Sequence, residues 1–258
     1  MSRRAFATGQ GDIVRFTGLA IVAAALVGLS STAEGQQVMG RCATCHFANI
    51  PDVPGASHLG EWAASPHAAA GVGCESCHGG NPTTVVPSEA HRGVESPRLA
   101  WSRVAPAHLP ATCGACHAAE RDAFRRSPHD APLASGVANA PTCSTCHGAM
   151  TSRVPSAAAL ELRCARCHGP QSVGAGYPGR ARAFVTALMS IDTDLSQARW
   201  RLSRGGGGAR ARALEAEAGA RLAEVAEAWH TFDMAEAERR ANAARAAVDN
   251  LLAQLENP

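Results

Sequence analysis

The pentapeptide Cys143-Ser-Thr-Cys146-His147 decides the fold of this chain, because its pattern occurs five times and uses every cysteine. The other copies are Cys42-Ala-Thr-Cys45-His46, Cys74-Glu-Ser-Cys77-His78, Cys113-Gly-Ala-Cys116-His117 and Cys164-Ala-Arg-Cys167-His168. Cys-x-x-Cys-His is the attachment pattern of c-type haem. The two thiols reach the two vinyl groups of one porphyrin, and the histidine that follows lies under the iron as its proximal ligand. The sequence therefore predicts five covalently bound haem c groups.

Three other uses of paired cysteines fit the pattern less well. Disulfides are common in exported chains, but they require no histidine after each pair. Zinc sites also use Cys-x-x-Cys, yet five of them would not each place a histidine at the same position. A thioredoxin-like redox motif needs one Cys-x-x-Cys on a βαβ unit, and the sequence shows no such strand pattern.

The composition excludes several classes of protein. Hydrophobic residues make up 46% and charged residues 18% of the 258 residues, which excludes a disordered polar tract and a membrane bundle. The net charge of +2 argues against a nucleic-acid partner. Lysine is absent, which rules out a catalytic lysine, a Schiff base and a P-loop. Aromatic residues are only 4%, so five porphyrins are expected to supply much of the apolar surface that is buried.

Residues 1–33 are predicted to be a signal peptide. Basic residues precede an apolar run at 16–29, which is shorter than the roughly 20 residues that span a bilayer, and Ser31-Thr32-Ala33 supplies small residues for cleavage. The mature protein is therefore expected in the periplasm. The alternative is an uncleaved leader that would anchor the protein in the membrane.

The number of remaining histidines matches the number of irons that need a second axial ligand. Six histidines lie outside the motifs, and five irons need five distal ligands. His67 and His129 are the strongest candidates, because each ends an aromatic-x-x-Ser-Pro-His segment and precedes a motif that ends in His-Gly. His91, His108 and His230 are also predicted distal ligands, and His58 is the predicted spare. Methionine is the competing ligand type, but Met189 and Met234 have the helical spacing of core residues.

Two regions follow the leader, and the predicted class is mainly α. Residues 34–178 are rich in glycine and proline and predict short helices and loops that form a pentahaem-binding domain. Residues 179–258 predict long helices from apolar residues near a 3.6 period, with a break at 205–208 and Asp233 as an N-cap. We expect this C-terminal helical region to be a hairpin or three-helix packing that brings His230 to the haems. The alternative is a coiled-coil oligomerisation arm that leaves His230 exposed.

With these motifs and the Ser-Pro-His segments in place, the chain resembles the multihaem cytochrome c superfamily. This superfamily includes small tetrahaem carriers, quinol dehydrogenase subunits and pentahaem cytochrome c nitrite reductases. The position of His230 on a late, long predicted helix is similar to that of a histidine in the nitrite reductase group. Those enzymes usually bind the catalytic haem through lysine, which this chain lacks. Quinol dehydrogenase subunits keep a transmembrane anchor, whereas the leader here looks cleavable. Both differences favour an electron carrier.

The expected function is electron transfer between redox partners through mostly bis-histidine haems, without a catalytic residue. Such irons have no open position for a substrate. The donor and acceptor would be redox proteins, among them a membrane quinol-oxidising complex or a terminal reductase. The alternative is a reductase of a small nitrogen or sulfur oxyanion, which would need one haem with an open site.

Overall fold

The computed structural model describes residues 41–48, 56–205 and 207–256. All of these residues belong to one compact unit, Val38–Pro258. The structure within these ranges is helical and contains no strand, which confirms the predicted mainly α class. The predicted signal peptide, residues 1–33, lies outside the described residues.

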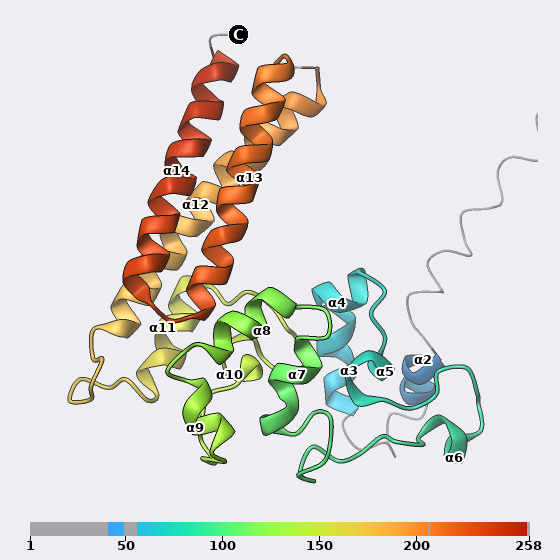
Figure 1. Ribbon diagram of the computed structural model, residues 1–258. Helices are drawn as coiled ribbons and strands as arrows, with labels where there is room; N and C mark the ends of the chain where they lie inside the picture. Colours follow the sequence, from blue (N-terminus) through green and yellow to red (C-terminus); the bar gives the residue numbers. More distant parts are fainter. Residues whose placement is uncertain (1–40, 49–55, 206, 257–258) are drawn as a thin grey trace, which may run out of the picture. The chain divides into compact units, whose positions relative to one another are not determined.

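Short helices carry the cysteine motifs, as the sequence predicts (Figure 1). Helix α5 (Cys74–His78) and helix α10 (Cys143–His147) coincide with whole motifs, and helix α2 (Arg41–Ala48) contains another. Helix α7 (Leu109–Cys113) ends on the first cysteine of its motif, and helix α11 (Ala157–Ala165) contains Cys164. The remaining short helices are α3 (Ala56–Ala63), α4 (Pro66–Ala69), α6 (Pro87–Ala90), the 3-10 helix η2 (Pro106–His108), α8 (Ala118–Arg125) and α9 (Asp130–Ala134).

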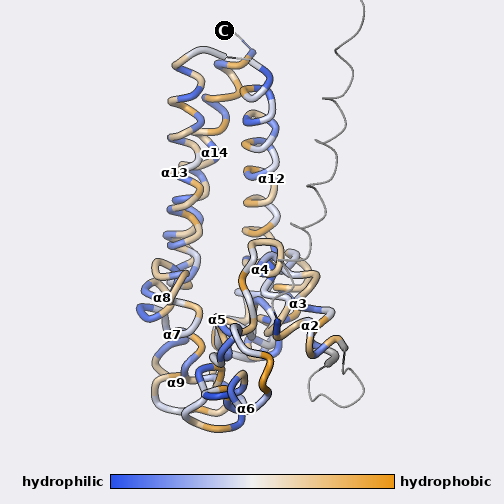
Figure 2. The backbone as a smooth tube through the Cα atoms, turned by 90° about the vertical axis from the view of Figure 1, so that its right-hand side faces the viewer, coloured by the Kyte–Doolittle hydropathy of each residue, from blue (hydrophilic) through white to orange (hydrophobic). Residues whose placement is uncertain are grey.

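Three long helices follow, and they confirm the predicted C-terminal packing. Helices α13 (Ala209–His230) and α14 (Met234–Glu256) form a hairpin, and helix α12 (Tyr177–Ser203) packs against both. Figure 2 shows hydrophilic and hydrophobic residues alternating along each of them, as expected for helices with one buried face. Helix α11 contacts α12 and helix α8 contacts α13, so the long helices are joined to the motif-bearing region.

The main hydrophobic core lies among these long helices and is rich in alanine. Leu195, Val225, Val248 and Leu251 are its largest fully buried side chains. Alanines between them allow the helix axes to approach closely; the buried ones are Ala181, Ala198, Ala211, Ala218, Ala228, Ala237, Ala241, Ala244 and Ala247. Met234 is buried here as predicted, whereas the same prediction for Met189 is wrong, because that side chain is 54% exposed.

The motif-bearing region has a much smaller side-chain core. Within the described ranges, the hydrophobic cluster of this region consists of Ala43, Trp62 and Ala68, with Phe47 and Met150 packed against it. The chain thus orders many short helices with few buried apolar side chains. This is the packing expected where large prosthetic groups contribute the apolar surface.

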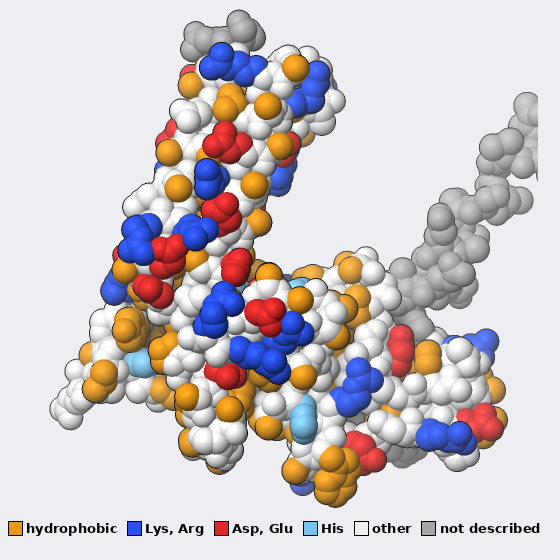
Figure 3. All heavy atoms as spheres, viewed as in Figure 1, with side chains coloured by type: hydrophobic (Ala, Val, Ile, Leu, Met, Phe, Trp, Pro, Cys, Tyr) orange, Lys and Arg blue, Asp and Glu red, His pale blue; other side chains and the backbone are white. Residues whose placement is uncertain are grey.

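The charged side chains of the long helices pair with one another. Figure 3 shows positive and negative side chains interspersed over α13 and α14. Arg240 bridges Glu224 and Glu236, and Arg245 bonds to Asp194 of α12. These exposed pairs each add little to stability. Of the described helices, none is both long and apolar enough to cross a membrane.

Asp233 lies directly before α14 and caps its N-terminus, as predicted. Its Oδ1 accepts hydrogen bonds from the backbone N–H groups of Ala235 and Glu236, each at 3.0 Å. An aspartate at this position satisfies amide groups that have no partner inside the helix.

Asp233→Ala should therefore lower the free energy of unfolding by about 1 kcal/mol. Asp233→Asn keeps the accepting oxygen and should cost much less. Chemical denaturation of the haem-loaded protein, followed by helical circular dichroism, measures both. Equal stability of the alanine and wild-type proteins would contradict the capping role.

Candidate functional site

In the first, second and fourth motifs, local helix geometry places the two thiols and the histidine together. In α10 the cysteines are three positions apart and therefore share one face of the helix, and His147 completes the last turn. Gly148 follows with φ of 81°, and Gly79 follows α5 with φ of 77°. Glycine adopts these angles without strain, so both helices end immediately after the motif histidine.

Four histidine rings are oriented by hydrogen bonds from Nδ1 to backbone carbonyl oxygens. His91 bonds to Pro87 at 2.8 Å and His230 bonds to Ala226 at 2.6 Å. Among motif histidines, His147 bonds to Arg153 and His168 to Val173, both at 3.1 Å. A carbonyl oxygen can only accept, so Nδ1 carries the proton and Nε2 keeps its free electron pair. This is how proteins fix histidine that binds a metal ion.

The structure brings four motif histidines close to histidines from outside the motifs, with one pair of rings stacked at 14° and three tilted at 34–59°. The distances between ring centroids cover a narrow range, 5.9–6.1 Å. The pairs are His46 with His91, His67 with His117, His129 with His168, and His147 with His230. Rings in direct contact would be closer. A metal–imidazole bond is about 2 Å long, so one metal ion bonded to both rings fills such a gap.

The remaining motif histidine, His78 of the second motif, lies near His58. Burial lowers the pKa of His78, and the charge of His58 lowers it further. Burial likewise lowers the pKa of His129, with His168 adding to the effect. In both cases the neutral imidazole is favoured, and this is the form that binds metal. Nδ1 of His58 lies 3.4 Å from the Glu61 carboxylate, which leaves its Nε2 unengaged by that contact.

His108 belongs to none of these pairs. It ends η2, is exposed, and its Nε2 donates to the carbonyl oxygen of Ala100 at 2.9 Å. The backbone hydrogen bond of His108 thus uses Nε2, whereas the four histidines described above use Nδ1. His108 as a distal ligand and His58 as the spare histidine stay predictions.

The serines of the two repeated segments are both buried and position the histidines that follow them. Ser65 caps α4, and its side chain accepts from the N–H of Ala68 at 3.2 Å. Ser127 accepts from the N–H of His129, also at 3.2 Å. The ring of Phe232 then packs edge-on against the His129 ring, with 4.2 Å between centroids.

Consecutive motifs are neighbours in space. Helix α2 contacts α5, α7 contacts α10, and α10 contacts α11. Thiols take part: the Cys113 thiol interacts with Cys143, and this raises the pKa of Cys113 more than its burial does. Burial raises the pKa of Cys146 to about 11, and Cys164 adds to the rise. The second and third motifs meet at Cys77, whose pKa is raised by burial and then by Cys113.

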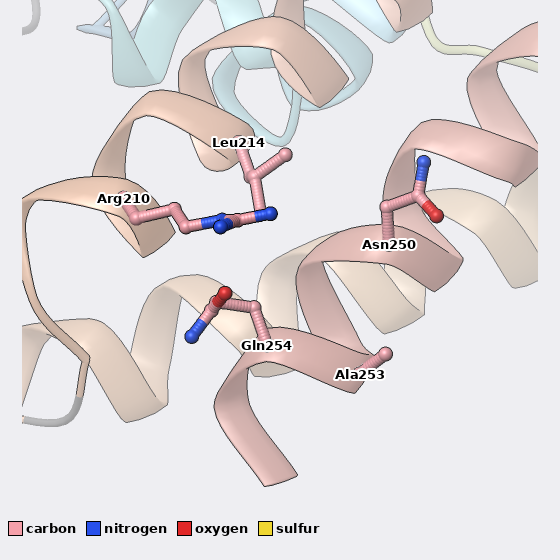
Figure 4. A pocket seen from close by; sticks show the side chains of 5 residues that line it. All are labelled: Arg210, Leu214, Asn250, Ala253 and Gln254. Atoms are coloured by element: carbon pink, nitrogen blue, oxygen red, sulfur yellow. The ribbon is translucent and has the colours of Figure 1, made fainter. Parts of the chain in front are cut away.

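These donors fit haem c. None of the ten cysteines, all of which lie in the described residues, forms a disulfide. Each motif offers two thiols for attachment, and in four of the five motifs the ring centroid of the histidine lies 5.9–6.1 Å from that of a second imidazole. Haem c would supply a one-electron iron centre there. One pocket of the described residues, between α13 and α14, is lined by Arg210, Leu214, Asn250, Ala253 and Gln254 (Figure 4). Another lies in the motif-bearing region, where residues of α7 and α9 line it.

Comparison with known proteins agrees with the motifs. Residues 24–79, which include the first two motifs, match the family of cytochrome c554 and c-prime. The chain is 30% identical over 112 residues to the C-type polyheme cytochrome OmcC of Geobacter sulfurreducens. This similarity covers 41% of the chain but only 14% of that relative. No solved structure matches the chain.

His230 is expected to complete a metal site with His147. His230→Ala should convert one metal centre from low-spin to high-spin and should make α13 and α14 more sensitive to protease, because the bond that ties them to α10 is lost. Electron paramagnetic resonance and limited proteolysis measure the two effects. An unchanged low-spin spectrum would exclude His230 as a ligand.

Proposed function

Because this chain is a multihaem c-type cytochrome, we propose that it carries electrons between redox partners through five covalently attached haems. The observation that supports this most strongly is the narrow range of distances, 5.9–6.1 Å, in four histidine pairs. Two imidazole ligands leave an iron without an open position, and bis-histidine irons change little in geometry when they gain or lose an electron.

The proposed ligand set gives each motif histidine one partner. The four facing pairs account for His46, His117, His147 and His168. His58 is assigned to His78, because its charge acts on His78 and its Nε2 is unengaged by Glu61. His108 becomes the spare histidine, since its Nε2 is held by Ala100.

The contacts between neighbouring motifs support a linear path. Motifs that are consecutive in the sequence contact one another, so electrons would pass from the first site to the fifth in chain order. The terminal sites also carry exposed apolar side chains. Val85 is 78% exposed shortly before His91, and Val173, whose carbonyl orients His168, is 97% exposed. We assign electron entry and exit to these two ends.

The partners are proposed to be a redox donor and a redox acceptor. The donor would be a membrane quinol-oxidising complex, or the acceptor would be a terminal reductase. The predicted leader places this exchange in the periplasm. Apolar surface beside a terminal site suits brief docking of another redox protein, because small interfaces of this kind release their partner quickly.

The number of haems and the cleavage site can be tested together. The denatured protein, isolated from the periplasmic fraction, should have the mass of residues 34–258 plus five haems. Mass spectrometry under denaturing conditions retains only covalently bound groups. A mass with fewer haems, or one that includes residues 1–33, would contradict the respective part of the proposal.

The choice between His58 and His108 is tested by a matched pair of variants. His58→Ala should leave one of five irons high-spin, because His78 loses its partner, and His108→Ala should leave all five low-spin. Electron paramagnetic resonance of the oxidised proteins distinguishes them.

The opposite result would restore His108 as the ligand. A high-spin centre in the wild-type protein would instead favour the alternative function, reduction of a small oxyanion at an open haem.

A further inference from the structure

Arg163 is partly buried and has one guanidinium nitrogen that no group of the described residues satisfies. Its Nη1 atom is buried and has no hydrogen-bond partner among the described residues. Two arginines of the adjoining helix α12 are paired, Arg182 with Glu161 and Arg180 with Glu238, each at 3.0 Å. A buried guanidinium nitrogen without a partner is destabilising, so an anion is expected at this position.

The surroundings of Arg163 locate the expected anion between the fourth and fifth motifs. Arg163 precedes Cys164 on α11, and α11 contacts α10. Cys146 of the fourth motif and Cys164 of the fifth pack against the same hydrophobic core as Leu160 of α11. Arg163 therefore lies at the junction of the fourth and fifth motifs.

The nearest acidic side chain in the sequence cannot serve this guanidinium as a free partner. Glu161 lies two residues before Arg163, and its carboxylate already receives a hydrogen bond from Arg182. Two haems that meet at this junction would bring carboxylates of their own, since each haem carries two propionates. A planar guanidinium binds a carboxylate through two parallel hydrogen bonds.

We propose that Arg163 binds a haem propionate at the junction of the fourth and fifth motifs. This inference rests on the proposed haem attachment. The carboxylate belongs to the haem attached at Cys143 and Cys146 or to the haem attached at Cys164 and Cys167. By pairing with it, Arg163 keeps a positive charge beside one iron and raises the reduction potential of that haem, because positive charge favours the ferrous state.

The test compares three variants of the haem-loaded protein. Arg163→Gln should lower the midpoint potential of one of five haems. Arg163→Lys keeps the charge and should restore most of the potential. The control, Arg180→Gln, removes an exposed arginine of the same region that pairs with Glu238, leaves Glu161 engaged by Arg182, and should leave all five potentials unchanged. Redox titration followed by visible absorption measures them.

A second variant identifies the source of the carboxylate. His230→Ala is expected to make the fourth-motif haem high-spin and so to mark it spectrally. In the double variant with Arg163→Gln, a shift of the marked component assigns the propionate to that haem. A shift of a low-spin component assigns it to the fifth-motif haem.

Unchanged potentials in Arg163→Gln would overturn the inference while leaving electron transfer intact. If Arg163→Gln does not fold, Arg163→Lys still decides, because replacing the planar fork by an ammonium should move a carboxylate band of isotope-labelled haem propionate in redox infrared difference spectra. Unmoved bands would exclude the contact. A wild-type mass with fewer than five haems would instead count against the proposed function itself.

Discussion

The separation between paired imidazole rings is the constraint on which the rest of the structure depends. Ring centroids 5.9–6.1 Å apart are neither in contact nor independent. The chain holds several of these rings by their Nδ1 atoms, through backbone carbonyls that lie within the same local turn or helix. Fixing one nitrogen to the backbone aims the other across the gap. Short helices joined by loops suit this task, because each can orient one ring separately.

The pairs also interlock segments that are distant in the sequence. His91 follows the second motif but faces the histidine of the first, and His67 precedes the second motif but faces that of the third. His129 in turn reaches the fifth motif across the fourth. No stretch of the motif-bearing region is therefore complete by itself. This explains how the region is ordered although its side-chain core is small, and why the larger alanine-rich core lies among α12, α13 and α14.

Much of this arrangement was predictable from sequence. The five motifs, the break at 205–208, the hairpin and the cap at Asp233 each follow from local chemistry that a few adjacent residues determine. The proposed choice of His58 over His108 as a ligand could not be predicted in this way, because it depends on which ring nitrogen forms a hydrogen bond. The carbonyl of Ala100, eight residues away, occupies Nε2 of His108. Met189 was misjudged for a similar reason: helical spacing identifies a face, but only packing shows which face is buried. The partnerless nitrogen of Arg163 has no signal in the sequence.

The turn between α13 and α14 connects the C-terminal helices, which carry no motif, to two histidines of the motif-bearing region. Phe232 adopts a left-handed backbone angle, with φ of 58°, that is costly for an aromatic residue. The turn thereby holds Phe232 against His129 while His230 faces His147. A frameshift or premature stop after the fifth motif would leave every attachment cysteine intact yet remove both contacts. On the proposed ligand set, such a shortened chain would keep all five haems but expose one iron to small molecules. Loss of the C-terminal helices would thus let oxygen and other small molecules bind to one iron and take up electrons there.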